Sequence, residues 1–144
     1  IQSFDWRLLQ IAQKVSPEIP TSYLTAQQPW FDNIHEGTME TSPWLAGFNI
    51  DDYSGSIVEM IKAAGGKVWA PFFREVDSSK VKLAHARDML VKVWTVNEFQ
   101  DMLSLIDMGV DGIITDYPNV LREALKKREM NLPPQLHKAK KLYL

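Results

Sequence analysis

The side chains that could take part in binding or chemistry gather at the ends of short predicted strands. They are hydroxyl, amide, carboxylate and aromatic groups: Ser3, Phe4, Thr25, Phe72, Trp94, Thr95, Asn97, Thr115 and Asp116. Because ligands of parallel β/α proteins bind beyond the carboxyl ends of the strands, these residues would line one common site. The set contains one carboxylate and no histidine. It predicts one wall of a binding site without the full set of groups that catalysis would need.

Other candidate groups are few. His85 falls among predicted helical residues, where we interpret it as structural. His35 lies in a long loop and could reach a ligand, although a single loop histidine is usually solvated. The chain contains no cysteine, which excludes thiol chemistry and a disulfide scaffold.

Residues 91–118 contain the clearest pattern for positioning these side chains. Residues 91–96 are β-branched and aromatic, apart from one lysine, which is typical of a buried strand. The next apolar residues recur with helical spacing and predict one helix face: Phe99, Met102, Leu103 and Ile106. Gly109 is placed to end that helix, and residues 112–115 form a second short apolar strand. Two strands joined by one helix predict a parallel, right-handed β/α unit.

Polar residues in this stretch also match helix-capping patterns. Asn97, with Gln100 three positions later, predicts an N-terminal capping box for the helix. Asp116 is similarly placed to cap the final helix, whose first turn suits Pro118. For both polar side chains a capping role therefore competes with a role in the site.

The rest of the chain repeats the β/α unit. Further strands are predicted near residues 1–4, 23–25 and 68–72, which gives five in all. Asp5 should cap a helix that carries several apolar residues on one face: Leu8, Ile11, Ala12 and Val15. Ser56 should cap a second helix, and Asp77 or Ser78 a third.

Residues 26–55 interrupt this regular pattern. They show no convincing periodicity but contain five aromatic residues: Trp30, Phe31, Trp44, Phe48 and Tyr53. A long stretch of this kind inside a compact domain is often functional. The alternative is a surface excursion whose aromatic side chains pack on its own base.

Repeated β/α units indicate an α/β fold, either an open doubly wound sheet or a closed barrel. The glycine-rich phosphate loops GxGxxG and GxxxxGK[ST] are absent from the sequence, which weakly favours the barrel. A length of 144 residues predicts one domain. The formal charge of −2 gives no reason to expect a nucleic-acid partner, and no apolar run is long enough for a transmembrane segment.

The chain begins on a strand rather than on Met, so we expect its natural beginning to lie upstream. A cysteine-free sequence is compatible with a cytoplasmic, periplasmic or secreted location. The last residues, from Asn131 through two prolines to a lysine-rich end, are expected to form a loosely held tail.

The sequence resembles the glycerophosphodiester phosphodiesterase family. WTVN at 94–97 and GVDGIITDYP at 109–118 are similar to the C-terminal signature of that family. QSFDW at 2–6, PWLAGF at 43–48, GGKVWAPFF at 65–73 and AHARDMLVKVWTVN at 84–97 extend the resemblance over most of the chain. One departure is Asp88-Met89, where related sequences usually have a helix-ending glycine.

The resemblance implies a TIM-type (β/α) barrel of which this chain contains about the last five β/α units. Residues 1–130 would form the C-terminal part of the domain, and residues 131–144 the tail. The family hydrolyses glycerophosphodiesters to glycerol 3-phosphate and an alcohol, with two histidines as acid and base. A divalent cation, Mg²⁺ or Ca²⁺, is held by carboxylates and stabilises charge on the phosphoryl group.

The resemblance implies no catalytic and no metal-binding residue in this chain, because those groups lie upstream of the family's Ser-Phe strand. Glu75-Val76-Asp77 matches the family's Glu-x-Asp pattern but lies where a helix begins, so we interpret it as a cap. What the resemblance places here is substrate-binding surface. Phe4 and Trp94 would contact the glycerol or alcohol portion, and Ser3 and Asn97 are weaker candidates.

Two classes of function remain open. In the first, the chain is part of a phosphodiesterase, and activity requires an N-terminal portion. In the second, the chain is an inactive, truncated barrel fragment that folds only by oligomerising or by pairing its open strand edges with a partner. Another phosphate-handling barrel is a more distant alternative.

Overall fold

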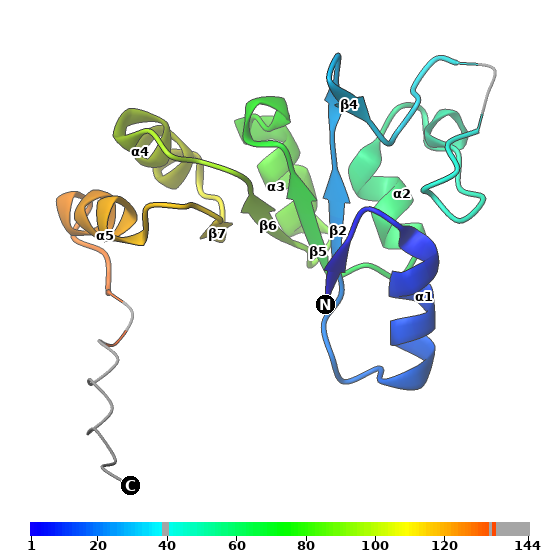
Figure 1. Cartoon of the computed structure of the whole chain (residues 1–144), viewed down its shortest axis with the longest axis horizontal. Helices are drawn as coiled ribbons and strands as arrows, with labels where there is room; N and C mark the ends of the chain where they lie inside the picture. Colours follow the sequence, from blue (N-terminus) through cyan, green and yellow to red (C-terminus); the bar gives the residue numbers. More distant parts are fainter. Residues whose placement is uncertain (39–40, 133, 135–144) are drawn as a thin grey trace, which may run out of the picture.

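The chain folds into a parallel sheet whose strands are separated by helices, as the computed structural model shows (Figure 1). The structure describes residues 1–38, 41–132 and 134. The predicted tail, residues 131–144, therefore lies largely outside the described residues.

Five strands form the main sheet in chain order, β1-β2-β5-β6-β7, and all neighbours are parallel. They are β1 (Gln2–Ser3), β2 (Ser22–Thr25), β5 (Val68–Pro71), β6 (Leu90–Val93) and β7 (Gly112–Ile113). The five predicted strands are confirmed. The sheet is not closed, so β1 and β7 each have one neighbour in this structure.

Helices connect consecutive strands and follow the last one. They are α1 (Trp6–Val15), α2 (Ile57–Ala63), α3 (Ser78–Ala86), α4 (Phe99–Met108) and α5 (Pro118–Lys127), with short 3₁₀ turns η1 (Ile50–Tyr53) and η2 (Phe73–Glu75). The loop of residues 26–55 contains a small antiparallel hairpin of β3 (Gln27–Gln28) and β4 (Phe31–Asp32). We call residues 27–32 the aromatic hairpin.

Three of the predicted caps are confirmed. The Asp5 carboxylate accepts from the backbone N–H of Arg7, and the Ser56 hydroxyl accepts from that of Glu59. Asp77 caps α3 by accepting from the backbone N–H groups of Ser79 and Lys80. These bonds satisfy backbone donors that have no partner within the first helical turn.

Two predicted caps are wrong. The N-cap of α4 is Glu98 rather than Asn97, and the N-cap of α5 is Tyr117 rather than Asp116; neither cap residue makes a side-chain bond to the helix. Asn97 and Asp116 instead bond to each other across the ends of two strands. Both side chains therefore make a tertiary contact in place of the helix caps that the local sequence predicted.

The hydrophobic core lies between the sheet and its helices. In β6, buried Val91 and Val93 alternate with exposed Leu90 and Lys92, so one face packs on helices and the other is open. The core includes large side chains from the first half of the chain: Trp6, Leu9, Tyr23, Met60, Ile61 and Trp69. The apolar face predicted for α4, formed by Phe99, Met102, Leu103 and Ile106, belongs to this core or packs against it.

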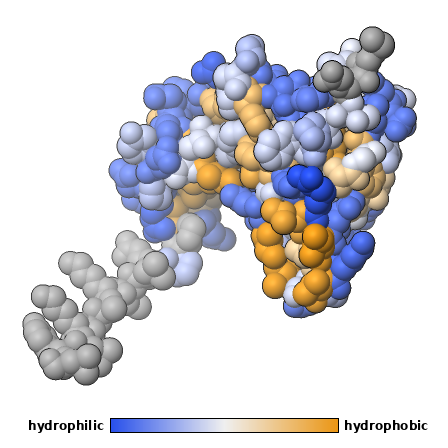
Figure 2. Space-filling model, turned by 45° about the vertical axis from the view of Figure 1, so that its right-hand side comes forward, coloured by the Kyte–Doolittle hydropathy of each residue, from blue (hydrophilic) through white to orange (hydrophobic). Residues whose placement is uncertain are grey.

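Helix α1 differs from the others. Its buried residues are Trp6 and Leu9, while Leu8 and Ile11 are each 57% exposed and Val15 is 76% exposed. The apolar stripe predicted for this helix therefore exists but faces away from the core. Figure 2 shows a hydrophobic patch on this side of the molecule. The strand β1, which contacts α1, is an edge strand of the sheet.

The departure at Asp88 has a structural cost. Asp88, which follows the C-cap residue Arg87 of α3, takes the left-handed backbone conformation, with φ of 55°. Glycine adopts this conformation without strain, and aspartate tolerates it better than most residues. The resemblance correctly identified this position as one where a glycine would fit.

Candidate functional site

Aromatic side chains that follow three of the strands meet at the carboxyl ends of the sheet. Phe4 follows β1, Phe72 follows β5 and Trp94 follows β6. The Trp94 ring centroid lies 5.4 Å from that of Phe4 and 5.7 Å from that of Phe72, both with edge-to-face geometry. The Trp94 indole N–H donates to the carbonyl of Ala70 at 2.7 Å, which fixes its orientation. The sequence-predicted pair of Phe4 and Trp94 is thus brought together.

The loop between β2 and α2 adds further rings to this surface. Phe31 lies 4.8 Å from Phe4, and Trp30 lies 5.3 Å from Phe72. Trp44, beyond the aromatic hairpin, lies 6.1 Å from Phe31. We call these six residues the aromatic cluster: Phe4, Trp30, Phe31, Trp44, Phe72 and Trp94.

The aromatic residues of the loop fall into two groups: some pack on the base of the loop, and the others lie at the candidate site. Phe48 packs against Trp6 and Tyr53, with centroid distances of 5.9 and 6.3 Å, and supports the base of the loop. Trp30, Phe31 and Trp44 instead extend the strand-end surface. Sequence reasoning did not include these three among the site residues, although their position in an unusually long loop was the available signal.

Hydrogen bonds hold the aromatic hairpin to the sheet. Buried Asn33 accepts from the backbone N–H of Ala26 at 2.8 Å and donates to the Leu24 carbonyl at 3.2 Å. Glu75 Oε1 accepts from the backbone N–H of Gln27 and from the side chain of Gln28, each at 2.7 Å. These hydrogen bonds therefore fix the position of the hairpin that carries Trp30 and Phe31.

Burial shapes the electrostatics of Glu75. Desolvation raises the pKa of this half-buried carboxyl above its usual range, and the bonds from Gln27 and Gln28 oppose the shift. Its second oxygen, Oε2, is buried and accepts no hydrogen bond in the structure. Glu75 therefore supports the hairpin at the cost of burying one carboxyl oxygen that has no hydrogen-bond partner.

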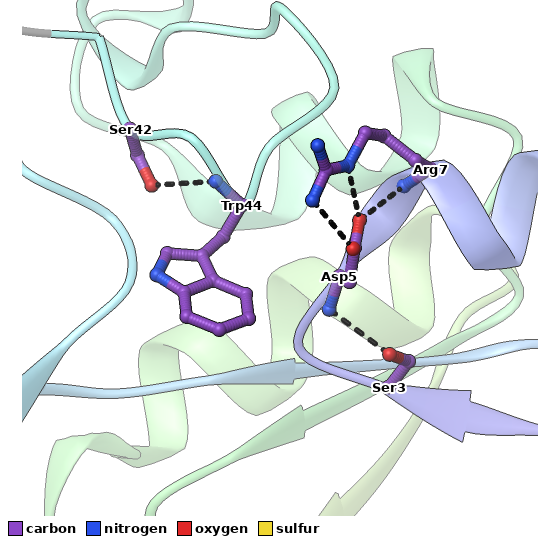
Figure 3. A network of polar contacts seen from close by, with 5 residues as sticks. All are labelled: Ser3, Asp5, Arg7, Ser42 and Trp44. Atoms are coloured by element: carbon purple, nitrogen blue, oxygen red, sulfur yellow. Dashed lines mark hydrogen bonds and ion pairs between the residues drawn. The ribbon is translucent and has the colours of Figure 1, made fainter.

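The predicted polar residues at the β1 end have local partners (Figure 3). Ser3 Oγ accepts from the backbone N–H of Asp5 at 3.0 Å. The Asp5 carboxylate binds the Arg7 guanidinium through two contacts of 2.8 and 2.7 Å, and the hydrogen bond with Arg7 lowers the pKa of Asp5. The carbonyl of Trp44 accepts from the N–H of Trp6 at 2.9 Å, which joins the loop to the start of α1.

Asn97 joins the ends of β6 and β7. Its amide nitrogen donates to Asp116 Oδ2 at 2.9 Å, and its oxygen accepts from the Thr115 hydroxyl and the Asp116 N–H at 3.2 and 3.0 Å. These bonds use the polar atoms of Asn97 within the chain. The residue is well placed to hold the strand ends in register.

The remaining candidates lie away from the aromatic cluster or serve other contacts. His85 Nε2 lies 2.9 Å from Asp111 Oδ2, in keeping with a structural role. His35 occupies a left-handed position in the loop, with φ of 59°. Within the part of the chain that the structure describes, no three His, Asp or Glu side chains are grouped so that they could hold a metal ion.

The strands of the parallel sheet follow one another in chain order, as they do in a β/α barrel, whereas the order reverses in a doubly wound sheet. The fold is therefore of the β/α barrel type, here with an unclosed sheet. The chain belongs to the Glycerophosphoryl diester phosphodiesterase family, whose model matches residues 1–120. The predicted family is confirmed.

The chain is also similar to individual proteins. A Silicibacter pomeroyi structure described as a glycerophosphoryl diester phosphodiesterase is 32% identical, with a TM-score of 0.71, over 92% of this chain and 39% of that one. The Bacillus subtilis glycerophosphodiester phosphodiesterase is 30% identical over 88% of this chain and 36% of its own length. The dermonecrotic toxin LarSicTox-alphaIB2bii of Loxosceles arizonica is 33% identical over 59% of this chain and 38% of the toxin. The chain thus spans less than half the length of each relative.

Proposed function

We propose that residues 1–130 supply the C-terminal part of a glycerophosphodiester phosphodiesterase barrel, and that their role is to bind and orient the substrate. The observation that supports this role is the pair of Phe4 and Trp94, in edge-to-face contact at the strand ends. Their faces would pack against the carbon skeleton of the glycerol or alcohol portion and exclude water from it.

Ser3 and Asn97 would act mainly by positioning. Ser3 holds the turn that follows β1, directly before Phe4, and Asn97 ties the end of β6 to the end of β7. Both keep the substrate wall rigid, which limits the entropy lost on binding.

The described residues do not fit the divalent cation that the family resemblance implies, because they contain no suitable group of ligands. We therefore propose that the carboxylate ligands for Mg²⁺ or Ca²⁺ and the acid–base histidines come from outside this chain. When bound there, the cation would stabilise charge developing on the phosphoryl oxygens.

The test is to compare the chain with a hybrid protein. In the hybrid, residues 1–130 replace the matching segment of the Silicibacter pomeroyi relative. We expect the 144-residue chain alone to release glycerol 3-phosphate from glycerophosphocholine no faster than buffer containing Mg²⁺ or Ca²⁺. We expect the hybrid to release it in a metal-dependent reaction. Metal-dependent release by the homogeneous chain alone would show that the chain contains the catalytic residues that we place outside it.

A second candidate is an inactive barrel fragment that is stable only in association with another copy or a partner. The exposed apolar side of α1 favours this candidate, because Leu8, Ile11 and Val15 are mostly open to solvent beside the edge strand β1. In the described part of the chain, no helix combines the length and hydrophobicity needed to cross a membrane. A hybrid that folds but shows no hydrolysis would favour this second candidate.

A further inference from the structure

A cavity of about 370 Å³ lies apart from the aromatic cluster. It is lined by residues of α2, α3, β5 and the loop between β2 and α2, and we call it the α2–α3 cavity. None of the six residues of the aromatic cluster lines it. Its volume falls within the range of small-ligand sites, about 300–1,000 Å³. The α2–α3 cavity is therefore a second candidate site, separate from the strand ends.

The inner part of this cavity is apolar. Buried Ile57 and Val58 line it from α2, and Leu83 lines it from α3. The Trp69 side chain also lines it, and the indole N–H of Trp69 donates to the Thr25 hydroxyl at 2.9 Å. Since that N–H already has a partner, the tryptophan offers the cavity a fixed apolar surface. Such a lining favours a ligand with an apolar portion.

A carboxylate lies at the rim of the cavity. Exposed Glu36 accepts through Oε2 from the side-chain amide of Gln27 at 2.7 Å, and both residues line the cavity. Glu36 Oε1 lies against Gly55, where an added Cβ atom would be only 2.8 Å from it. Gly55 therefore leaves room for the carboxylate, and Gln27 holds it in place. The oxygen that Gln27 does not bind can accept from a ligand.

An ammonium group lines the same cavity from α3. Lys80 Nζ donates to the backbone carbonyl of Glu75 at 2.8 Å, and two of its three donors remain for a ligand. In the described ranges of the chain, neither Glu36 nor Lys80 takes part in an ion pair. Two opposite charges thus line one cavity without neutralising each other.

The backbone at the rim is strained. Ser54 and Gly55, which both line the cavity, take the left-handed conformation, with φ of 54° and 76°. Glycine adopts this conformation at no steric cost, whereas serine does not. Strained backbone of this kind is concentrated at ligand sites and switch regions. The turn before α2 therefore also favours a binding role for the cavity.

We propose that the α2–α3 cavity binds a free α-amino acid with an apolar side chain. The ammonium group of the ligand faces Glu36, its carboxylate faces Lys80, and its side chain packs on Trp69 and on the apolar residues of the two helices. A simple amine would leave Lys80 without a partner, and a simple carboxylic acid would leave Glu36 without one. The inference does not depend on the proposed function, because the cavity and the aromatic cluster share no residue.

The test measures binding of L-leucine to the 144-residue chain by ligand-observed NMR. Two analogues serve for comparison: isocaproate, which lacks the ammonium group, and isoamylamine, which lacks the carboxylate. We expect leucine to bind roughly two- to fivefold more tightly than each analogue, because each analogue loses one partly exposed ion pair. Glycine, which lacks the apolar side chain, should bind more weakly than leucine.

Two substitutions separate the two charges. Glu36→Gln should abolish the preference for leucine over isocaproate and keep the preference over isoamylamine, and Lys80→Met should do the reverse. The matched controls are Glu98→Gln and Lys82→Met, which make the same changes at exposed residues outside the cavity and should leave both preferences unchanged.

Glu36 and Lys80 are exposed, so neither substitution should change the melting curve. A general loss of folding would weaken the binding of all probes and could not produce opposite effects on the two analogues. Leucine that binds no more tightly than the analogues would overturn the inference. It would also be overturned if both preferences survived Glu36→Gln and Lys80→Met, or if the control substitutions removed them.

Discussion

The apolar side of α1 should drive self-association of the isolated chain. Leu8 and Ile11 are each 57% exposed, which together amounts to slightly more than one complete aliphatic side chain. Complete burial of such a side chain is worth about 1.5–3 kcal/mol, so covering this pair contributes about 2–3 kcal/mol per copy. Val15 and the open edges of β1 and β7 add to the tendency.

The perturbation is the double substitution Leu8→Lys and Ile11→Lys. It removes the favourable contact from both copies, about 4–6 kcal/mol in all, and puts positive charge on both surfaces that would meet, so the association constant should fall by at least about 1000-fold. The entropy lost on association is common to the wild type and the variant and cancels in the comparison.

Light scattering and sedimentation at micromolar concentration measure the effect. The control is Ala86→Lys with Gln100→Lys, which adds the same charge at two exposed positions on α3 and α4. We expect the wild type and the control to associate and the α1 variant to shift toward monomer. A wild-type chain that is a monodisperse, cooperatively melting monomer would refute the argument, as would equal association of all three proteins.

Three further perturbations test the site and its support. In the hybrid protein, Trp94→Ala should lower kcat/KM on the order of ten- to a hundredfold without abolishing metal binding, because loss of the aromatic contact costs roughly 1–3 kcal/mol; unchanged kinetics in a folded variant would make Trp94 a packing residue. Burial raises the pKa of Glu75 above its ordinary value of 4.5, so the stability it contributes is present below that pH and is lost as the pH rises through the folded pKa. In urea unfolding, the free energy of unfolding of Glu75→Gln should therefore increase relative to that of the wild type as the pH rises from below 4.5 to neutrality. A difference in unfolding free energy that does not change with pH would contradict the raised pKa. Asp88→Gly should raise the free energy of unfolding by roughly 0.5–1 kcal/mol by relieving the left-handed strain, and a lower melting temperature would exclude that explanation.

Local sequence signals identified the regular elements well. Helix starts at Asp5, Ser56 and Asp77 could be predicted because capping depends on residues within three positions of each other. Gly109 ends α4 in the left-handed conformation, as its position indicated. The parallel pairing of the strands on either side of α4 could also be predicted, since a short β/α unit places its two strands side by side.

Long-range contacts explain the parts that could not be predicted. Asn97 matched a capping pattern, but its partner Asp116 lies 19 residues further along the chain. The burial of a helix face depends on neighbouring elements, so periodicity alone could not show that Leu8 and Ile11 face solvent. The hairpin that places Trp30 depends on Glu75, 47 and 48 positions away from its partners in the hairpin.

The sequential order of the sheet has a consequence for how the chain opens and closes. Within the five-stranded sheet, each strand pairs with the strands of that sheet nearest to it in sequence, so stability is built up unit by unit along the chain, as in repeat proteins. The central strands β2, β5 and β6 have two neighbours each, whereas β1 and β7 have one. Amide hydrogens should therefore exchange fastest at the two ends of the sheet and slowest at its centre. In such an arrangement, fraying from either end of the sheet would release Phe4 or the Asn97–Asp116 hydrogen bond before the core unfolds. The chain would therefore lose its ability to bind substrate before it unfolds as a whole.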